Sequence, residues 1–192
     1  MKRDNIHIIL GSQSPRRREL MKGIDIPFTA VSIEADETYP DSLQGGNIPL
    51  YISRAKARAY AGEMNEDDLL ITADTIVWVD NKMLGKPHNE EQAKEMLREL
   101  SGKTHQVFTG VTFLYKGEYE SFVDETNVTF KTLSEEEIDY YIRTYKPFDK
   151  AGAYGVQEYI GYIGVTKMEG SYFNVMGFPI SRVYDKLRQL LT

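Results

Sequence analysis

Apolar residues fall into short runs along the chain, separated by polar segments that carry turn residues or helical spacing. The runs are rich in β-branched and aromatic residues, which is typical of strands buried on one or both faces. A polar Asp-Thr pair at 74–75 interrupts one of them. The pattern predicts strands at 6–10, 27–33, 68–79, 106–115, 120–131 and 159–168.

Capping residues mark the helices between these runs. Ser14 with Pro15 is a typical helix start, and Gly23 is a typical stop. Asn89 with Gln92, and Ser134 with Glu137, have the spacing of capping boxes. The pattern predicts helices at 15–22, 49–63, 90–100, 135–145 and 179–191.

The order of these elements predicts an α/β fold with a mixed sheet flanked by helices. Helices alternate with strands, but Lys116-Gly117-Glu118 predicts a hairpin, which a purely parallel sheet does not contain. The densest loop signal, at 39–49, looks like a connection before a helix. We therefore expect one domain over 1–192. A division of this domain into two lobes around a central cleft stays open as an alternative.

Composition excludes several classes of protein. The chain has 192 residues, 41% of them hydrophobic, and 13 Tyr and 8 Phe, which is enough to bury a core. It has no cysteine, which excludes disulfides and thiolate chemistry. The net charge of −6 opposes nucleic-acid binding, and no apolar run suits a membrane span. The N-terminal segment lacks the pattern of a signal peptide, so we expect a cytoplasmic protein.

Three arginines, Arg16, Arg17 and Arg18, stand in the first turn of the first predicted helix. The positive end of the helix dipole disfavours each of them by ~0.3–1 kcal/mol. Free backbone N–H groups, small serines and arginine side chains at a helix start can bind phosphate. A capped, solvated basic face accounts for the same residues. Spacing alone supports these two interpretations about equally, and the segment matches neither a Walker A loop nor G-x-G-x-x-G.

This segment is the first of several motifs that together resemble the Maf family of nucleoside triphosphate pyrophosphatases. In order, the matches are S-Q-S-P-R-R at 12–17, D-E at 36–37, R-A-K-A at 54–57, T-A-D-T at 72–75, G-K-P at 85–87, L-S-G at 100–102, H-Q-V at 105–107, D-K-A-G-A-Y-G-V-Q at 149–157, G-S-Y at 170–172 and G-F-P at 177–179. Thr72 stands where the family motif has glycine, and we expect no functional cost from this difference.

The resemblance implies a Maf/ITPase-like fold and the hydrolysis of a nucleoside triphosphate to its monophosphate and pyrophosphate. It implies that Asp74 is the general base, which activates water directly or through a bound metal. From the residues alone, a structural role for Asp74 would be favoured, because Asp often begins a turn. The resemblance further implies that the substrate is bound by Ser12, Arg16, Arg17, Lys56 and Lys86.

A divalent metal, Mg²⁺ or Mn²⁺, is the cofactor that the resemblance implies. Its implied ligands are Glu37, Asp74 and the neighbouring Asp36. Neighbouring carboxylates suit a hard cation that prefers oxygen ligands. For Asp36, an acidic loop in an acidic protein is an alternative that stays open.

Base preference divides the family into a subgroup for dTTP and UTP and another for 7-methyl-GTP. Arg16, Thr75 and Gln157 match the positions implied to discriminate, with the identities of the pyrimidine subgroup. A glutamine amide can donate to one carbonyl of uracil or thymine and accept from the ring N–H. A purine or methylated-purine pyrophosphatase is the alternative enzyme. A non-catalytic nucleotide-binding regulator of cell division is the alternative from another class, and the family suggests a homodimer.

Other polar and aromatic residues carry weaker signals. A lone His105 at the start of a strand predicts a packed, hydrogen-bonded side chain rather than an acid or base. Most of the tyrosines are expected in half-buried strands, with Tyr154 as a candidate neighbour of the nucleobase. Arg18 is expected to point outward as a surface residue.

Overall fold

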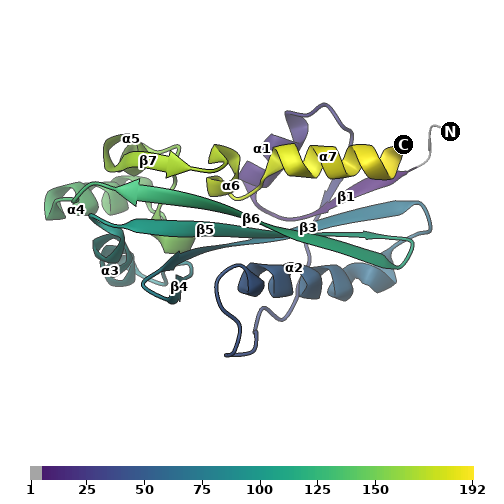
Figure 1. Ribbon diagram of the computed structural model, residues 1–192, viewed down its shortest axis with the longest axis horizontal. Helices are drawn as coiled ribbons and strands as arrows, with labels where there is room; N and C mark the ends of the chain where they lie inside the picture. The colour runs from purple at the N-terminus through teal and green to yellow at the C-terminus, as the bar shows by residue number, and fades with distance from the viewer. Residues whose placement is uncertain (1–5) are drawn as a thin grey trace. The chain divides into compact units, whose positions relative to one another are not determined.

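The computed structural model describes residues 6–192, and its elements form a mixed sheet with flanking helices (Figure 1). The strand order is β2-β1-β3-β5-β6-β7, and β4 pairs with β3. The strands are β1 (His7–Gly11), β2 (Thr29–Val31), β3 (Asp68–Val79), β4 (Lys82–Leu84), β5 (Thr104–Tyr115), β6 (Glu118–Phe130) and β7 (Val165–Glu169). The helices are α1 (Pro15–Lys22), α2 (Asn47–Tyr60), α3 (Glu90–Leu100), α4 (Glu135–Tyr145), α5 (Tyr159–Gly164), α6 (Tyr172–Val175) and α7 (Ile180–Leu191), with short 3₁₀ turns at Ala61–Glu63 and Ala151–Ala153.

Pairing in the sheet is of both kinds, as the sequence predicts. Strand β1 pairs in parallel with β2 and with β3, and Gly11 lies opposite Thr72. Strands β4 and β7 pair antiparallel with β3 and β6. The turn between β3 and β4 uses Asp80 and Asn81 at positive φ, a conformation that Asn and Asp tolerate better than most residues. The predicted α/β class with a mixed sheet is confirmed.

The chain divides into two compact units, each with its own core. The first consists of Met1–Asp74, Thr109–Asp124 and Gly177–Thr192, and the second of Thr75–Phe108 and Glu125–Met176. In the first unit, Ile8 and Leu10 of β1 pack in one apolar cluster, while Ile9 between them packs in another. Because successive side chains of a strand point to opposite faces, both faces of β1 are covered by apolar side chains. Helices α1 and α7 lie on one face and α2 on the other (Figure 1).

Helix α2 lies very close to β5 because position 110 has no side chain. A Cβ at Gly110 would lie 2.4 Å from the carbonyl carbon and oxygen of Pro49, which is shorter than any ordinary contact. Pro49 is in the first turn of α2, where its missing N–H costs nothing. Glycine is therefore required at this position for the helix to pack on the strand.

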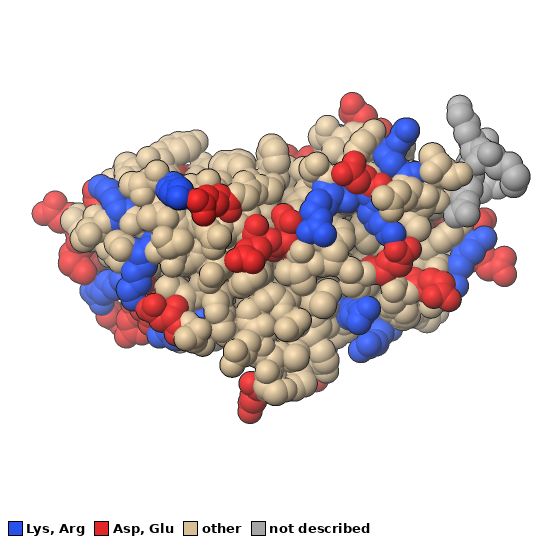
Figure 2. Space-filling view, viewed as in Figure 1, with Lys and Arg blue, Asp and Glu red and all other residues tan. Residues whose placement is uncertain are grey.

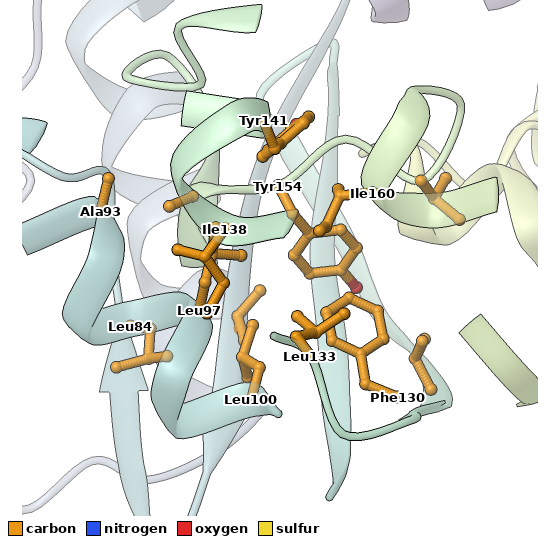
Figure 3. Packing of buried hydrophobic residues seen from close by; sticks show 14 of the residues in the cluster. Leu84, Ala93, Leu97, Leu100, Phe130, Leu133, Ile138, Tyr141, Tyr154 and Ile160 are labelled. Carbon is orange, nitrogen blue, oxygen red and sulfur yellow. The ribbon is translucent and has the colours of Figure 1, made fainter. Parts of the chain in front are cut away.

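The second unit has a core that combines leucine and isoleucine side chains with aromatic rings (Figure 3). Phe130 and Tyr154 meet edge to face with ring centroids 5.0 Å apart, a favoured geometry for aromatic pairs. Ala93, Leu97 and Leu100 of α3 are fully buried in the same cluster, at the i, i+4, i+7 spacing of a helix face. Burying each leucine contributes ~1.5–3 kcal/mol.

The helix starts predicted from capping residues agree with the structure, with one difference in detail, whereas α2 begins at Asn47, two residues before the predicted start. Ser14 accepts the N–H of Arg17, and Ser134 with Glu137 forms a complete capping box. At α3, the side chain of Asn89 accepts the N–H of Gln92, but Gln92 returns its bond to the N–H of His88. This bond fixes the residue before the cap instead of the cap itself.

One predicted strand is wrong in its first half. The expected strand at 159–168 begins as the helix α5 (Tyr159–Gly164), and only Val165–Glu169 is a strand. The carbonyl of Glu158 accepts the N–H groups of Gly161 and Tyr162 and starts the helix. Gly161 then lies so close to the carbonyl of Val156 that a Cβ would be 2.0 Å away. Tertiary packing at this glycine overrides the strand preference of the tyrosines and isoleucines.

Charges of both signs are mixed over the face of the molecule drawn in Figure 2, with Lys and Arg next to Asp and Glu. Ion pairs at the surface of the described chain include Lys103 with Asp80 and Lys82 with Glu99. Within residues 6–192, no helix combines the length and apolar character needed to cross a membrane.

Candidate active site

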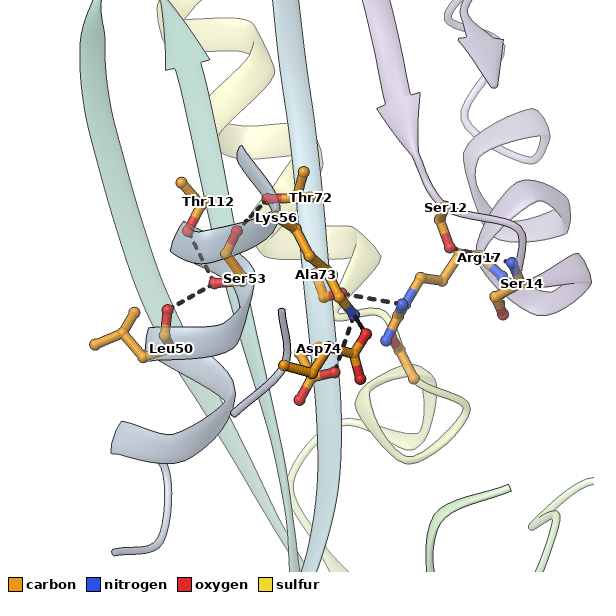
Figure 4. A network of polar contacts seen from close by, with 12 residues as sticks. Ser12, Ser14, Arg17, Leu50, Ser53, Lys56, Thr72, Ala73, Asp74 and Thr112 are labelled. Carbon is orange, nitrogen blue, oxygen red and sulfur yellow. Dashed lines mark hydrogen bonds and ion pairs between the residues drawn. The ribbon is translucent and has the colours of Figure 1, made fainter. Parts of the chain in front are cut away.

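The segment between β1 and α1 folds around its two serines. The Oγ of Ser12 accepts the N–H of Ser14 at 3.1 Å, and the Oγ of Ser14 caps α1 (Figure 4). Ser12 is buried, and its carbonyl accepts from the Nε of Arg18 at 3.2 Å. Hydrogen bonds within the segment therefore fix the start of α1, where we expected phosphate to bind.

Arg17 is held by backbone carbonyls from two distant segments. Its Nε donates to the carbonyl of Gly177 at 2.8 Å, and its Nη1 donates to the carbonyl of Ala73 at 3.1 Å. Burial lowers the pKa of the guanidinium, while the negative charge of Asp74 acts in the other direction. Arginine stays protonated at neutral pH even when shifted, so a positive charge lies beside the strand that carries Asp74.

Lys56 of α2 joins two carboxylates in the same place. Its Nζ lies 3.1 Å from Oδ1 of Asp74 and 3.1 Å from Oε1 of Glu37, and it also donates to the carbonyl of Ala73 at 3.4 Å (Figure 4). The side chains of Lys56 and Asp74 are only 14% and 15% exposed, whereas that of Glu37 is 59% exposed. The sequence placed these three residues in one site, and the first unit does bring them together.

Asp74 has the electrostatic surroundings of a general base. Burial raises its pKa, and the nearby positive charges of Lys56 and Arg17 limit the rise. The contacts of Asp74 with the described residues use Oδ1, so Oδ2 can take a proton from water. A carboxylate whose pKa moves toward neutrality is a better base than an exposed one.

The implied metal ligands are placed differently from one another. Glu37 and Asp74 converge on the ammonium of Lys56, which shows that a cation fits between them. Asp36 is exposed, and its Oδ1 accepts the N–H of Thr38, which lowers its pKa. Among residues 6–192, no group of three or more His, Asp or Glu side chains forms a metal cage. Two carboxylates fit Mg²⁺, which often binds few protein ligands and completes its shell with water and phosphate.

The remaining implied residues lie in both units. Arg16 is half-buried on α1 in the first unit, and its charge further lowers the pKa of Arg17. In the second unit, Lys86 is exposed in the loop after β4, and Thr75 and Gln157 are half-buried. The carbonyl of Gly85 accepts the N–H of Gly152, which fixes the loop of Lys86 within this unit.

Tyr141 holds the segment that carries Gln157 within the second unit. Its hydroxyl accepts the N–H of Gly155 at 2.9 Å and donates to Oε2 of Glu158 at 2.8 Å. Oε1 of the same Glu158 pairs with Lys150 at 2.9 Å. The residues on either side of Gln157 are thus anchored, and no motif in the sequence indicates that Tyr141 has this role.

The prediction for His105 is confirmed. Its side chain is fully buried, and its Nε2 lies 2.7 Å from the hydroxyl of Tyr154. Burial lowers the pKa of His105 to about 4, so the imidazole is neutral at physiological pH. Tyr154 itself is 6% exposed and packs on Phe130, so its ring belongs to the core of the second unit.

Arg18 is not the outward-pointing surface residue that we expected. It is half-buried, and its bond to the carbonyl of Ser12 holds the segment between β1 and α1. The position of Arg18 in the first helix turn does not reveal this contact. The contact is made to a residue six positions earlier, outside the helix.

Comparison with known proteins assigns the family. The model of the Maf family, described as Maf-like protein, matches residues 7–190, and the chain belongs to this family. A protein of Phocaeicola vulgatus, named dTTP/UTP pyrophosphatase, is 57% identical over 184 residues, which is 95% of each chain. A protein of Bacteroides thetaiotaomicron with the same name is 55% identical over 97% of each chain.

Solved structures support the fold. A Ham1 protein of Staphylococcus aureus is similar with a TM-score of 0.53 and 13% identity, covering 94% of this chain and 99% of its own. A HAM1 protein of Coxiella burnetii is similar with a TM-score of 0.51 and 13% identity, covering 96% and 99%. The predicted Maf/ITPase-like fold is confirmed at this level.

Proposed function

We propose that this protein is a nucleoside triphosphate pyrophosphatase that hydrolyses dTTP and UTP to the monophosphate and pyrophosphate. The observation that carries the proposal is the buried Asp74 beside Lys56 and Arg17, next to the capped start of α1. Relatives with more than half of their residues identical are named for this activity. A purine pyrophosphatase and a non-catalytic regulator are not favoured by these names.

The reaction needs a nucleophile that attacks the α-phosphorus. A water molecule forms the new P–O bond, the bond from the α-phosphorus to the bridging oxygen breaks, and pyrophosphate leaves. Asp74 takes the proton of the water on Oδ2 while Lys56 holds Oδ1 and fixes the carboxylate orientation. The bound triphosphate brings more negative charge beside Lys56, which draws the ammonium toward the phosphates.

Charge neutralisation is the task of the basic residues. Ser12 and Arg16 at the start of α1, with Lys56 and Lys86, bind the phosphate oxygens, because cations and free N–H groups stabilise the charge that develops there. Arg17 contributes its charge from a fixed position, since two of its N–H groups hold backbone carbonyls. It thereby keeps the chain around Asp74 in place.

A divalent cation, Mg²⁺ or Mn²⁺, is part of the proposal. Glu37 and Asp74 would hold it together with phosphate oxygens, and Asp36 would join them if it gave up its bond to Thr38. When bound, the cation neutralises the triphosphate and the leaving group. Lys56 would then release Glu37 and keep its contact with Oδ1 of Asp74.

Base choice is assigned to Gln157, with Thr75 and Arg16 as the other discriminating residues. The Gln157 amide presents one donor and one acceptor, which match the imide edge of thymine and uracil. The anchoring of the neighbouring Gly155 and Glu158 limits the positions that this amide can take. A rigid polar site rejects a mismatched edge because it leaves buried groups unpaired.

A nucleotide panel tests the proposal directly. Pyrophosphate release is measured for dTTP, UTP, dCTP, GTP and 7-methyl-GTP, each with Mg²⁺, with Mn²⁺ and with EDTA. We expect release from dTTP and UTP with either metal and none with EDTA. Preference for GTP or 7-methyl-GTP would contradict the pyrimidine assignment, and unchanged rates in EDTA would contradict the metal.

The setting of the enzyme is a further part of the proposal. A net charge of −6 disfavours nucleic acid as a partner, and the substrates are nucleotides of the cytoplasm. We propose a homodimer in which each chain works as one Maf-like domain. Sedimentation equilibrium measures the oligomer, and a single cooperative unfolding transition would support one domain.

A further inference from the structure

Thr72 joins β3 to α2 within the first unit, at the position where the sequence departs from its family motif. Its side chain is fully buried, and its Oγ1 donates to the carbonyl of Ser53 at 2.7 Å (Figure 4). This length is typical of an O–H···O hydrogen bond, and a buried bond of this kind is stronger than one in water. Valine has nearly the same shape but lacks the donor.

The same strand and the same helix carry the ion pair of the candidate site. Asp74 follows Thr72 by two residues, so both side chains leave β3 on one face, about 6–7 Å apart. Lys56 follows Ser53 by three residues, which is about 4.5 Å along α2. Two contacts therefore connect β3 and α2 side by side, one from Thr72 to the helix backbone and one from Asp74 to Lys56.

Ser53 is itself fixed from its other side. Its hydroxyl donates to the carbonyl of Leu50 at 2.9 Å, and it lies 2.8 Å from the hydroxyl of Thr112 on β5. Each hydroxyl has one proton, so Ser53 must accept from Thr112. Thr112 in turn lies 3.0 Å from the hydroxyl of Ser121, which accepts from the Nε of Arg54. The turn of α2 before Lys56 is therefore tied to the sheet through backbone and side chain together.

The methyl group of Thr72 is also closely packed. Gly11, its partner in the parallel register, has so little space that a Cβ there would lie 3.0 Å from this methyl group. The threonine thus contacts the strand that leads to the phosphate segment and the helix that carries Lys56. A glycine at this position would make neither contact.

We infer that Thr72 is a positioning residue: its hydroxyl holds α2 in register with β3 and so keeps the Lys56 ammonium against the Asp74 carboxylate. Its effect on catalysis rests on the proposed function, whereas its effect on the ion pair does not. This role goes beyond our expectation that the departure from glycine has no functional cost, because it gives the threonine a task of its own.

Three variants test the inference by activity. Thr72→Val removes the hydroxyl, Thr72→Ser keeps it, and Thr126→Val is a matched control. Thr126 is equally buried, and its hydroxyl donates to the carbonyl of Ser171 at 3.0 Å, in the second unit. Both valine variants should lower the urea midpoint. Only Thr72→Val should lower kcat for dTTP, by about tenfold, with KM changed by less than about threefold, and Thr72→Ser should return kcat to within about twofold.

Three results would overturn the inference. One is a Thr72→Val enzyme with kcat within twofold of wild type. Another is an equal fall in kcat for Thr126→Val, which would show general destabilisation. The third is no recovery in Thr72→Ser, which would assign the effect to the methyl group.

A second measurement needs no turnover and separates this inference from the proposed function. Lys56→Met is combined with Thr72→Val, and the unfolding equilibrium constant is measured for the single and double variants. Independent positions add to within about twofold. We expect the effect of Lys56→Met to differ by at least about threefold between the two backgrounds. If wild type hydrolyses no nucleotide, the proposed function fails, yet this cycle still decides the positioning role; additive effects would overturn it.

Discussion

The two units bury polar groups of different kinds. The first unit buries charges: the guanidinium of Arg17, the ammonium of Lys56 and the carboxylate of Asp74 lie together with their partners. The second unit also holds an ion pair of low exposure, Lys150 with Glu158, and it buries neutral groups, His105 with Tyr154 and the hydroxyl of Tyr141. Burying a charge costs far more than burying a neutral hydrogen-bonded group. On the proposed function, the charges of the first unit serve catalysis, whereas Tyr141 and the pair of Lys150 with Glu158 hold the segment around Gln157.

The sharpest test of this contrast is Asp74→Asn, which keeps the shape and removes the charge. Turnover of dTTP should fall by ~10²-fold or more, because a positioned base contributes that order of rate. Burial raises the pKa of Asp74 in the folded protein above its value in the unfolded chain. Ionisation of Asp74 therefore lowers the free energy of unfolding as pH rises through the folded pKa. The melting temperature of the variant at pH 7 should therefore be unchanged or higher. Near wild-type turnover would make Asp74 structural.

His105 tests the neutral side of the comparison. Its pKa falls from the usual 6.5 to about 4 on folding, so the unfolded chain binds the proton more readily. The contribution of His105 to the free energy of unfolding is therefore fully present above pH 6.5 and is lost as pH falls toward 4. At pH 5 the loss is about 2 kcal/mol. Urea unfolding at pH 7 and 5 measures this loss. His105→Gln should remove about that much of the pH dependence while leaving kcat at pH 7 within about twofold; an unchanged slope would show that other groups cause it.

Gln157→Glu tests whether the second unit also contributes to specificity. A carboxylate can still accept the ring N–H, but its other oxygen would face a carbonyl of thymine or uracil without a donor, at a cost of ~1–3 kcal/mol. The kcat/KM for dTTP and UTP should fall by roughly tenfold or more. Guanine nucleotides should gain relative to them, since guanine presents N–H donors. If the ratio of dTTP to GTP does not move, Gln157 does not contact the base.

The smallest effect is expected at Arg18. Its side chain donates to the carbonyl of Ser12, and it is not among the residues that we propose to bind the substrate. Arg18→Ala removes one hydrogen bond to the carbonyl of Ser12, so kcat/KM should fall by no more than about threefold. Arg16→Ala, in the same helix turn, should lower kcat/KM by tenfold or more. Equal losses at both positions would mean that the cluster acts through diffuse charge, without a shaped binding site.

The sequence predicted the elements that local rules determine. Ser14 and Ser134 cap helices because their hydroxyls reach N–H groups three residues on, which is a local contact. The strands followed the alternation of apolar positions. The helix at Tyr159–Gly164 was missed because its cause is the close approach of Gly161 to Val156, which no single-residue preference contains.

The candidate site was predictable where motifs carry the chemistry, and not where distant contacts do. Asp74, Lys56 and Glu37 were chosen from motifs, and they meet in the structure. The bond from Arg17 to Gly177 joins residues 160 positions apart, and that from Thr72 to Ser53 joins residues 19 apart. Such contacts are set by how strands and helices stack, and they leave no local pattern in the sequence.

The close approach at Gly110 also limits how this protein can be changed in the laboratory. In a library of all single substitutions selected for activity, position 110 should be as intolerant as the catalytic positions, although Gly110 has no side chain with which to react. Any larger residue would meet the backbone at Pro49 and push out the helix that delivers Lys56. A map of mutational tolerance would therefore mark positions that set the spacing between α2 and β5 as well as positions that take part in the reaction. Asp74→Asn and Gly110→Ala would be told apart only by measuring stability together with activity.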